Sequence, residues 1–398
     1  MVTALQTLFQ SPRDPNFFQN PFTFYRKIRA SGKIVRWDDY NLVVTSDYTI
    51  VNNILRNRQF VRQPPEHVKS EIPDHLIPFY ENESRSMLER EPPYHTRVKS
   101  LVSPFFTSKK LAKMQIEIEN ICSDLLNEIT ETEFDLISSF SQKFPVIVIA
   151  KMLGVPATMA PQLVAWSSDM VAMYQARRNK LIEKKAASAT NDFSNYLKTL
   201  IKQKRLHPSD DLITHIIEVN PSESRLSDEE IISTIILLLN AGHEATVHTI
   251  SNGIKTLLES RFAITELMTN PKKLANEVLR YSTPLHMFTR YFTTKVSLCG
   301  RDFNAGDKIG LLLAAANRDP EHFSKPELFD PFIERKINLS LGAGLHFCLG
   351  AHLARLELEI ALVKLITKFP TMKISSTPIY QDNFHFYGLK ELVLKTTK

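Results

Sequence analysis

The sequence lacks the features of a membrane or secreted protein. It contains no run of about 18 or more apolar residues, and no basic segment followed by an apolar one begins the chain. We therefore expect neither a membrane span nor a signal peptide. The three cysteines are odd in number and show no paired or C-x-x-C spacing, which fits a reducing compartment, and we expect a cytoplasmic protein.

The chain also lacks obvious internal boundaries. No Gly/Ser-rich linker or block of like charge divides the 398 residues, of which 11 are glycine and 43% are hydrophobic. This composition predicts one large, helix-rich domain over residues 1–398. The formal charge of +6 is spread over short Lys/Arg groups and forms no basic tail, so we expect an acidic protein partner and no nucleic acid.

The run of residues 341–350, LGAGLHFCLG, is the most informative stretch of the chain. Gly342 and Gly344 can adopt backbone angles closed to other residues, so the chain can turn back tightly and a flat ligand can lie against it. Apolar residues at helical spacing follow Gly350, which places Cys348 at or just before a helix N-terminus. Amide N–H groups and the helix dipole stabilise a thiolate there, as an axial ligand of haem iron requires. The alternative is a buried structural cysteine, against which the Gly, Gly, His, Cys, Gly spacing weighs.

This run resembles the haem-ligand loop of the cytochrome P450 family, F-x-x-G-x-H-x-C-x-G, with Leu341 where phenylalanine is usual. The resemblance implies haem b as cofactor, Cys348 as the iron ligand, and Leu341, Gly344 and His346 as haem-binding residues. It also implies the cytochrome P450 fold, which is mainly α with a smaller β-rich part and has a long central helix over the haem. The β-rich part would lie mainly at residues 30–60, 285–315 and 375–398.

A long helix is predicted to start at Ser227, which forms a capping box with Glu230 and is followed by roughly thirty residues without proline. A glycine and an acid in its apolar middle, residues 241–246 (AGHEAT), are locally unfavourable, as is common at functional sites. The run resembles the oxygen-activation motif of the same family, A-G-x-[DE]-T-[ST]. The resemblance implies catalytic roles for Ala241, Gly242, Glu244 and Thr246, and contact with the haem for Ala245, which replaces the usual oxygen-contacting threonine.

Two further patterns are weak alone and fit the same family. His95 and Lys99 lie four apart on one helical face and could grip one anionic group, although an exposed pair of this kind is usually only solvated. The resemblance implies that His95, Lys99, Arg290 and His346 bind the two haem propionates, with Lys99 in place of an arginine and without its bidentate fork. It also implies a structural E-x-x-R pair at Glu277 and Arg280. Ile333 lies where an arginine that joins this pair is common, and whether Arg335 replaces it stays open.

The remaining segments give the expected surroundings of the site. We expect a long irregular loop over residues 60–93, a helix over 108–130 with Cys122 in the core, a buried helix over 144–156, and hairpins over 37–45 and over 384–394 with Gly388 at the turn. Cys299 falls in a strand-turn-strand unit over 296–310 without a role.

The resemblance implies a monooxygenase that hydroxylates a small-to-medium organic substrate with O₂. No flavin or iron–sulfur module fits in the length, so electrons would come from a ferredoxin or flavodoxin with its reductase. Candidate docking residues are Lys109, Lys110, Lys113 and Arg355. A peroxide-driven peroxygenase and a haem-binding sensor or carrier remain as alternatives.

Overall fold

The computed structural model describes residues 5–69, 71–218 and 226–397. They form two compact units, which we describe separately. Unit 1 consists of Met1–Ser70, His248–Ala351 and Ser376–Leu392, and unit 2 consists of Glu71–Val247, His352–Ser375 and Val393–Lys398. The prediction of a single domain over residues 1–398 stays a prediction.

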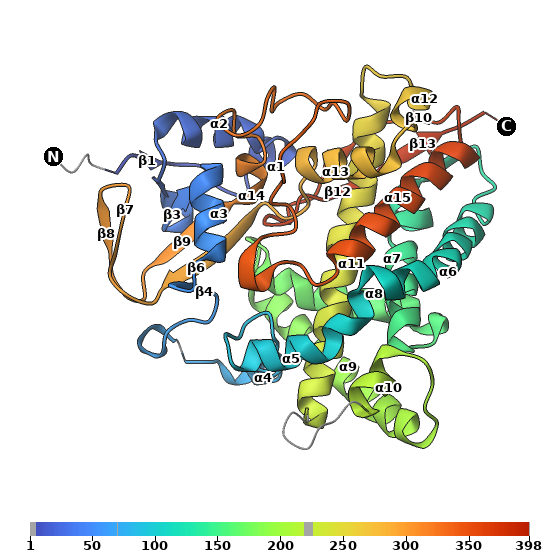
Figure 1. Cartoon of the computed structure of the whole chain (residues 1–398), viewed down its shortest axis with the longest axis horizontal. Helices are drawn as coiled ribbons and strands as arrows, with labels where there is room; N and C mark the ends of the chain where they lie inside the picture. The colour runs from blue at the N-terminus through green and yellow to red at the C-terminus, as the bar shows by residue number, and fades with distance from the viewer. Residues whose placement is uncertain (1–4, 70, 219–225, 398) are drawn as a thin grey trace. The chain divides into compact units, whose positions relative to one another are not determined.

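Unit 1 is built on a six-stranded sheet with the strand order β1-β2-β3-β9-β6-β4 (Figure 1). Its strands are β1 (Thr7–Leu8), β2 (Val35–Trp37), β3 (Leu42–Thr45), β9 (Lys308–Leu312), β6 (Met287–Phe292) and β4 (Phe60–Val61). Two small antiparallel pairs join β7 (Val296–Leu298) to β8 (Arg301–Phe303) and β11 (Ile379–Tyr380) to β12 (Leu389–Glu391). The α-helices of this unit are α1 (Pro15–Gln19), α2 (Phe22–Ser31), α3 (Tyr48–Arg56), α12 (Ile264–Leu267), α13 (Pro271–Tyr281) and α14 (Leu313–Ala316).

The two faces of this sheet have different neighbours. Helix α3 begins at the Asp47 cap, whose carboxylate accepts from the amide of Ile50, and packs its apolar side on one face (Figure 1). The core there combines α3 residues with side chains of β3, β6 and β9, with Leu339, and with Ala343 of the cysteine loop, residues 341–350. Successive side chains of a strand point to opposite faces, so every second residue of β6 and β9 faces away from α3.

Unit 2 is mostly helical. Its α-helices are α4 (Ile77–Ser84), α5 (Tyr94–Val102), α6 (Ser108–Asn127), α7 (Lys143–Leu153), α8 (Ala160–Val171), α9 (Lys180–Leu206), α10 (Leu212–Glu218) and α15 (Ala351–Lys368). A three-stranded sheet with the order β10-β13-β5 consists of β10 (Lys373–Ile374), β13 (Val393–Lys395) and β5 (Glu133–Asp135). Short 3₁₀ or π segments occur in both units at Asp38–Tyr40, Glu66–Val68, Asp74–Leu76, Ser103–Phe106, Ile137–Ser141, Ala157–Met159, Ala172–Tyr174 and Gly344–His346.

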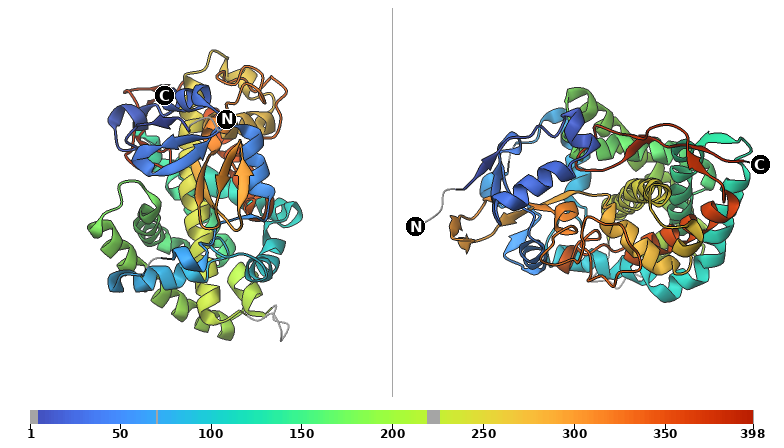
Figure 2. Two further views of the ribbon diagram at one scale, coloured as in Figure 1. Left: turned by 90° about the vertical axis from the view of Figure 1, so that its left-hand side faces the viewer. Right: turned by 90° about the horizontal axis from the view of Figure 1, so that it is seen from above.

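The long helix predicted from the capping box is α11 (Asp228–Leu258), which is continuous over 31 residues and is seen nearly end-on in the right-hand view of Figure 2. The Glu230 amide donates to the Ser227 hydroxyl at 3.2 Å, and the Ser227 amide donates to the Glu230 carboxylate at 2.9 Å. The box is therefore formed as predicted. The helix over 144–156 is also confirmed as α7, which ends where Gly154 adopts φ 83°.

Two predictions were wrong. The stretch 60–93 is not one irregular loop, because α4 lies inside it. This helix buries only Phe79 and Asn82, so it carries no apolar stripe that the sequence could reveal. The hairpin over 384–394 is also absent: β12 pairs with β11, and the amide of Tyr387 donates to Pro284 O at 2.9 Å. Gly388 is needed for another reason, since a Cβ there would lie 2.1 Å from the ring of His248.

Candidate active site

The predicted site residues divide between the two units. Those in unit 1 are Arg290, Leu341, Gly344, His346 and Cys348, and those in unit 2 are His95, Lys99, Ala241, Gly242, Glu244, Ala245 and Thr246. We describe the two groups in turn.

The cysteine loop of unit 1 is fixed by its own backbone. Gly342 and Gly344 adopt φ angles of 71° and 70°, in the left-handed region predicted for them. The loop closes where the amide of Cys348 donates to Leu341 O at 3.0 Å, and the carbonyl of Cys348 accepts from the amide of Ala351 at 3.3 Å, at the start of α15. The half-buried Cys348 thus lies three residues before a helix, as predicted.

Close packing explains why glycine is required in this loop. A Cβ on Gly344 would lie 2.1 Å from the backbone oxygen of Leu55, at the end of α3. A Cβ on Gly342 would make ordinary contact, at 3.5 Å, with the ring of Phe288 on β6. Because alternate residues of a strand share a face, Arg290 projects from the same face of β6 as Phe288, toward the side on which the cysteine loop packs. Arg290 is 2% exposed, and its guanidinium donates to Thr289 O at 2.9 Å.

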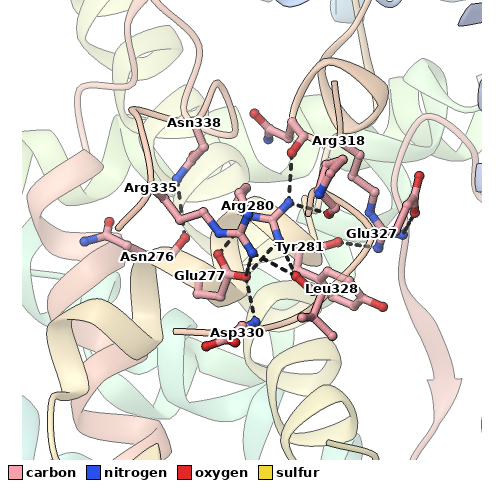
Figure 3. A network of polar contacts seen from close by, with 12 residues as sticks. Asn276, Glu277, Arg280, Tyr281, Arg318, Glu327, Leu328, Asp330, Arg335 and Asn338 are labelled. Carbon is pink, nitrogen blue, oxygen red and sulfur yellow. Dashed lines mark hydrogen bonds and ion pairs between the residues drawn. The ribbon is translucent and has the colours of Figure 1, made fainter. Parts of the chain in front are cut away.

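The E-x-x-R pair lies in the interior of unit 1 (Figure 3). Arg280 donates through Nε and Nη2 to the two carboxylate oxygens of Glu277, at 2.8 and 2.7 Å. It also donates to the backbone oxygens of Asn317, Pro326 and Leu328 at 2.8–3.0 Å. Both side chains are at most 2% exposed, so this pair is buried and is not the exposed ion pair that such a pattern usually gives.

Arg335 joins this pair, which answers the question that the sequence left open. Its Nη2 lies 3.3 Å from the Oε1 oxygen of Glu277, and the same group donates to Leu328 O at 3.0 Å (Figure 3). A further hydrogen bond runs from its Nη1 to Ser324 O. The carboxylate of Glu277 also accepts from the amide of Asp330 at 2.9 Å, so one acid ties α13 to the 324–335 segment.

Asn317 connects this network to the cysteine loop, a role that no local sequence pattern indicates. Its side-chain amide donates to the hydroxyls of Thr283 and Ser340 at 2.8 Å, and its oxygen accepts from the amide of Leu339 at 2.7 Å. Ser340 in turn donates to Leu279 O on α13 at 2.6 Å. The backbone is therefore held immediately before the loop begins at Leu341.

In unit 2, helix α5 presents His95 and Lys99 on one face. His95 is 3% exposed, whereas Lys99 is half-buried. The helix is tied to the start of α11, because Arg97 forms an ion pair with Glu230 of the capping box. Burial opposes ionisation of Glu230, but the hydrogen bonds from Arg97 and from the Ser227 amide lower its pKa.

The run of residues 241–246 lies within regular α-helix. Gly242 faces α7, where an added Cβ would lie 3.5 Å from the side chain of Ile149. Thr246 is 6% exposed, and its hydroxyl donates to Gly242 O at 3.0 Å. The helix does not bulge at Gly242, so Thr246 does not move toward the position of Ala245.

His243 is a residue whose significance the sequence did not indicate. It is 1% exposed, and its Nδ1 lies 3.8 Å from the Oε2 oxygen of Glu244, whose side chain is 15% exposed. A buried imidazole therefore lies next to a partly accessible carboxylate inside the long helix. The 3.8 Å separation is longer than a hydrogen bond, so a proton passes between these two side chains only through a water or after a small side-chain movement.

The positive charge is less evenly spread than predicted. Residues 177–206 contain nine Lys or Arg and two Asp or Glu, a surplus of seven against six for the whole chain. Most of this segment is α9, whose exposed Lys180, Lys184, Lys198 and Lys202 share one side of the helix, since 18 residues make five full turns. The opposite side carries buried residues such as Phe193.

The fold and the site together define a class of protein: a helix-rich chain with a smaller sheet, a long central helix and a glycine-framed cysteine loop before a helix. The family model described as Cytochrome P450 matches residues 2–273 and 262–387, and the chain belongs to the cytochrome P450 family. Within residues 5–69, 71–218 and 226–397, no helix combines the length and the apolar character needed to cross a bilayer.

The relatives are bacterial P450 proteins. Cytochrome P450 CYP107DY1 of Priestia megaterium is 32% identical to this chain, over 96% of this chain and 97% of its own length. The 6-deoxyerythronolide B hydroxylase of Saccharopolyspora erythraea is 33% identical, over 71% of this chain and 70% of its own length. The solved structure of P450BioI, in complex with an acyl carrier protein ligated to hexadec-9Z-enoic acid, superimposes with a TM-score of 0.91 at 30% identity and covers 96% of this chain and 100% of that one. The predicted fold is thus confirmed, and the protein is a P450 monooxygenase of the bacterial type with a haem cofactor.

Proposed function

We propose that the chain binds haem b with Cys348 as the axial iron ligand and hydroxylates a small-to-medium organic substrate with O₂ and two electrons from separate proteins. The observation that carries this proposal is the cysteine loop, which holds Cys348 between two left-handed glycines and the start of α15. The other two cysteines are poorer ligands, since Cys122 is fully buried in α6 and Cys299 is on an exposed turn.

The donor set fits this cofactor. The half-buried Cys348 before α15 supplies one thiolate of the kind that ligates haem iron. His95 and Arg290 are buried donors of the kind that bind carboxylates, and we assign them to the haem propionates together with Lys99 and His346.

When bound, the haem supplies the binding and activation of O₂ and the transfer of one oxygen atom. The chain's own contribution is to fix the sulfur and to deliver protons. The backbone bond from Cys348 to Leu341 O keeps the loop closed, so the sulfur position does not depend on the substrate. We assign proton transfer to the carboxylate of Glu244 with His243 as its buried neighbour.

The test of the iron ligand is Cys348→Ser, with Cys122→Ser and Cys299→Ser as matched controls. We expect Cys348→Ser to abolish the ferrous–CO absorption band that gives the family its name, and both controls to retain it. A band that survives in Cys348→Ser would refute the assignment.

We propose that a ferredoxin or flavodoxin delivers electrons near the start of α15. Helices α6 and α15 lie side by side in unit 2, where the Ser108 and His352 side chains are 3.4 Å apart, and both Lys109 and Lys113 are exposed nearby. Lys110 is a weaker candidate because it pairs with Asp210 at 2.9 Å. Reduction should slow with rising salt and in Lys113→Glu, and a rate that responds to neither would count against this docking face.

We propose that the substrate reaches the enzyme either free or attached to a carrier protein. The positive charge of α9 favours binding of such a carrier protein. P450BioI, a structural relative, was solved with an acyl carrier protein. The one-sided lysines of α9 would attract an acidic carrier domain. The double variant Lys184→Glu and Lys198→Glu should raise KM for a carrier-bound acyl chain and leave the free acid unaffected, whereas Lys109→Glu should slow both alike. Equal effects on bound and free acid would exclude carrier docking at α9.

A peroxide-driven peroxygenase is the second candidate, because Ala245 has no hydroxyl and the hydroxyl of Thr246 is bonded to Gly242 O. A non-oxygenating sensor or carrier is the third. Substrate-dependent O₂ consumption with a reductase system supports the first proposal, turnover with hydrogen peroxide alone supports the second, and binding without either supports the third. We propose a cytoplasmic location, which is supported by the odd number of cysteines and by their lack of paired or C-x-x-C spacing.

A further inference from the structure

Helix α11 carries a stripe of incompletely buried side chains within an otherwise buried stretch. Over residues 231–247, all positions but six are buried, and one of the six is Gly242, which has no side chain. The other five lie along one side of the helix, within about 140° of its circumference at 100° per residue. They are Leu237, Asn240, Ala241, Glu244 and Ala245. This stripe therefore faces space that the described residues leave open.

Asn240 is the uncharged polar member of the stripe. Asparagine is a poor helix former, and here it follows the apolar run of residues 235–239 (IILLL). A local rule that is broken in this way is expected at functional sites. Glu244 follows Asn240 by four residues and so lies one turn further along the same side of α11. Asn240 thus borders the run of residues 241–246 on the side that is left open.

The amide of Asn240 is only weakly held by the protein. Its nitrogen donates to the sulfur of Met170 on α8 at 3.8 Å, and its Oδ1 is covered and has no hydrogen-bond partner among the described residues. A thioether is a weak acceptor, and an amide nitrogen carries two N–H groups, so one N–H group remains for another acceptor. Because Oδ1 is covered, the exposed part of the side chain does not include it. An asparagine with a structural role would have both ends of its amide bonded, so the contact with Met170 does not by itself account for this residue.

We propose that Asn240 is a specificity-determining residue, whose second N–H group donates to a carbonyl or hydroxyl oxygen of the substrate. This inference rests on the proposed monooxygenase function and narrows its substrate class to compounds with such an oxygen near the oxidised carbon. The stripe contains the acid Glu244 and no cation, so a neutral oxygen fits there better than a carboxylate. A site that donates a hydrogen bond to a substrate oxygen also rejects an analogue that lacks this oxygen.

The test compares two rings of equal size, cyclodecanone and cyclodecane, on the holoenzyme of the parent and of Asn240→Leu. Binding is measured by headspace gas chromatography of sealed samples, which does not depend on the haem spectrum. Asn240→Leu should weaken cyclodecanone about three- to tenfold, as expected for the loss of one neutral hydrogen bond. It should bind cyclodecane at least as tightly as the parent, because leucine replaces a poorly paired amide. The parent should hydroxylate cyclodecanone mainly at one ring position, and Asn240→Leu should spread the product over several.

Thr234→Val is the matched control on the same helix. Thr234 is fully buried, and its hydroxyl already donates to Glu230 O at 2.7 Å, so this variant should leave the ratio of the two dissociation constants unchanged. Asn240→Leu should also keep the melting temperature of the parent, whereas a merely structural Asn240 would lower it and leave the ratio as it was.

The role of Asn240 is refuted if the parent does not bind cyclodecanone, if the ratio changes less than about twofold in Asn240→Leu, or if Thr234→Val changes it equally. These outcomes are distinct from failure of the proposed function. A parent protein without the ferrous–CO band would refute the proposed function, whereas a parent with the band and an unchanged ratio in Asn240→Leu refutes only the role of Asn240.

Discussion

Alanine substitutions at Gly344 and Gly300 can distinguish the cost of backbone strain from the cost of close packing at the cysteine loop. The two glycines have nearly the same backbone conformation but different surroundings. Gly344 has φ 70° and Gly300 has φ 75°, so an alanine at either position adopts the left-handed conformation. That costs roughly 1–2 kcal/mol for an L-residue. The surroundings differ, because a Cβ on Gly300 meets nothing within 4 Å, whereas one on Gly344 would lie 2.1 Å from Leu55 O.

The steric part of the cost can be worked out from that contact. Real Cβ atoms essentially never approach another heavy atom within 3.0 Å, so the loop or the end of α3 must move by about an ångström. Leu55 is 5% exposed in the core of unit 1, and movement of its backbone disturbs the packing of α3. Overpacking of a well-filled core costs roughly 1–3 kcal/mol. We therefore expect Gly300→Ala to cost about 1–2 kcal/mol and Gly344→Ala about 2–5 kcal/mol.

Chemical unfolding of both variants, together with haem content and the ferrous–CO band, measures the difference. Gly300→Ala should keep the parent haem content and band. Gly344→Ala should lose haem or shift the band, because the displaced loop carries Cys348. Equal unfolding free energies, or an unchanged band in Gly344→Ala, would refute the argument that this packing sets the position of the cysteine.

Three other predictions follow from buried charges and from the long helix. Arg335→Met should lower the free energy of unfolding by about 2 kcal/mol in a urea titration, because it removes a charged hydrogen bond to Glu277. The control Lys273→Met removes an exposed ion pair with Glu334 and should lower the free energy of unfolding by less than about 1 kcal/mol. Burial raises the pKa of Glu357 well above its usual value, so the folded protein keeps this acid neutral and loses stability as the pH rises above the usual carboxyl pKa. Glu357→Gln should therefore unfold at a higher urea concentration than the parent at pH 7–8 and at about the same concentration near pH 4, and the opposite trend would contradict the burial argument. Ala245→Thr assayed with a plain hydrocarbon should yield more product per NAD(P)H, and an unchanged ratio with intact binding would show that the proton path does not pass this position.

Elements whose signals are local were predictable from the sequence. The capping box fixed the start of α11, and Gly154 marked the end of α7 because a left-handed residue closes a helix. Helix α4 and the 384–394 segment could not be predicted, because no local signal in the sequence specifies them. Their conformations depend on partners remote in sequence: Phe79 and Asn82 alone bury α4, and Tyr387 bonds to the chain around residue 284.

The same distinction holds within the site. Glycines and cysteine at fixed spacing gave the candidate loop, since steric limits on the backbone act within a few residues. The role of Arg335 could not be derived, because its 3.3 Å contact with Glu277 joins residues 58 positions apart. The role of Asn317 is of the same kind, because its three side-chain hydrogen bonds reach Thr283, Leu339 and Ser340, which are 22 to 34 positions away.

The conformation of Thr246 bears directly on how the enzyme uses protons. A hydroxyl that donates to the carbonyl four residues earlier in its own helix is already satisfied, so it gains little by turning toward a ligand. Ala245 next to it supplies no hydroxyl at all. In the proposed mechanism, the polar group that positions a proton donor then comes from Glu244, from ordered water or from the substrate. Of these, only the substrate varies between reactions, so the fraction of O₂ that ends in product should depend strongly on whether the substrate carries a polar group near the oxidised carbon.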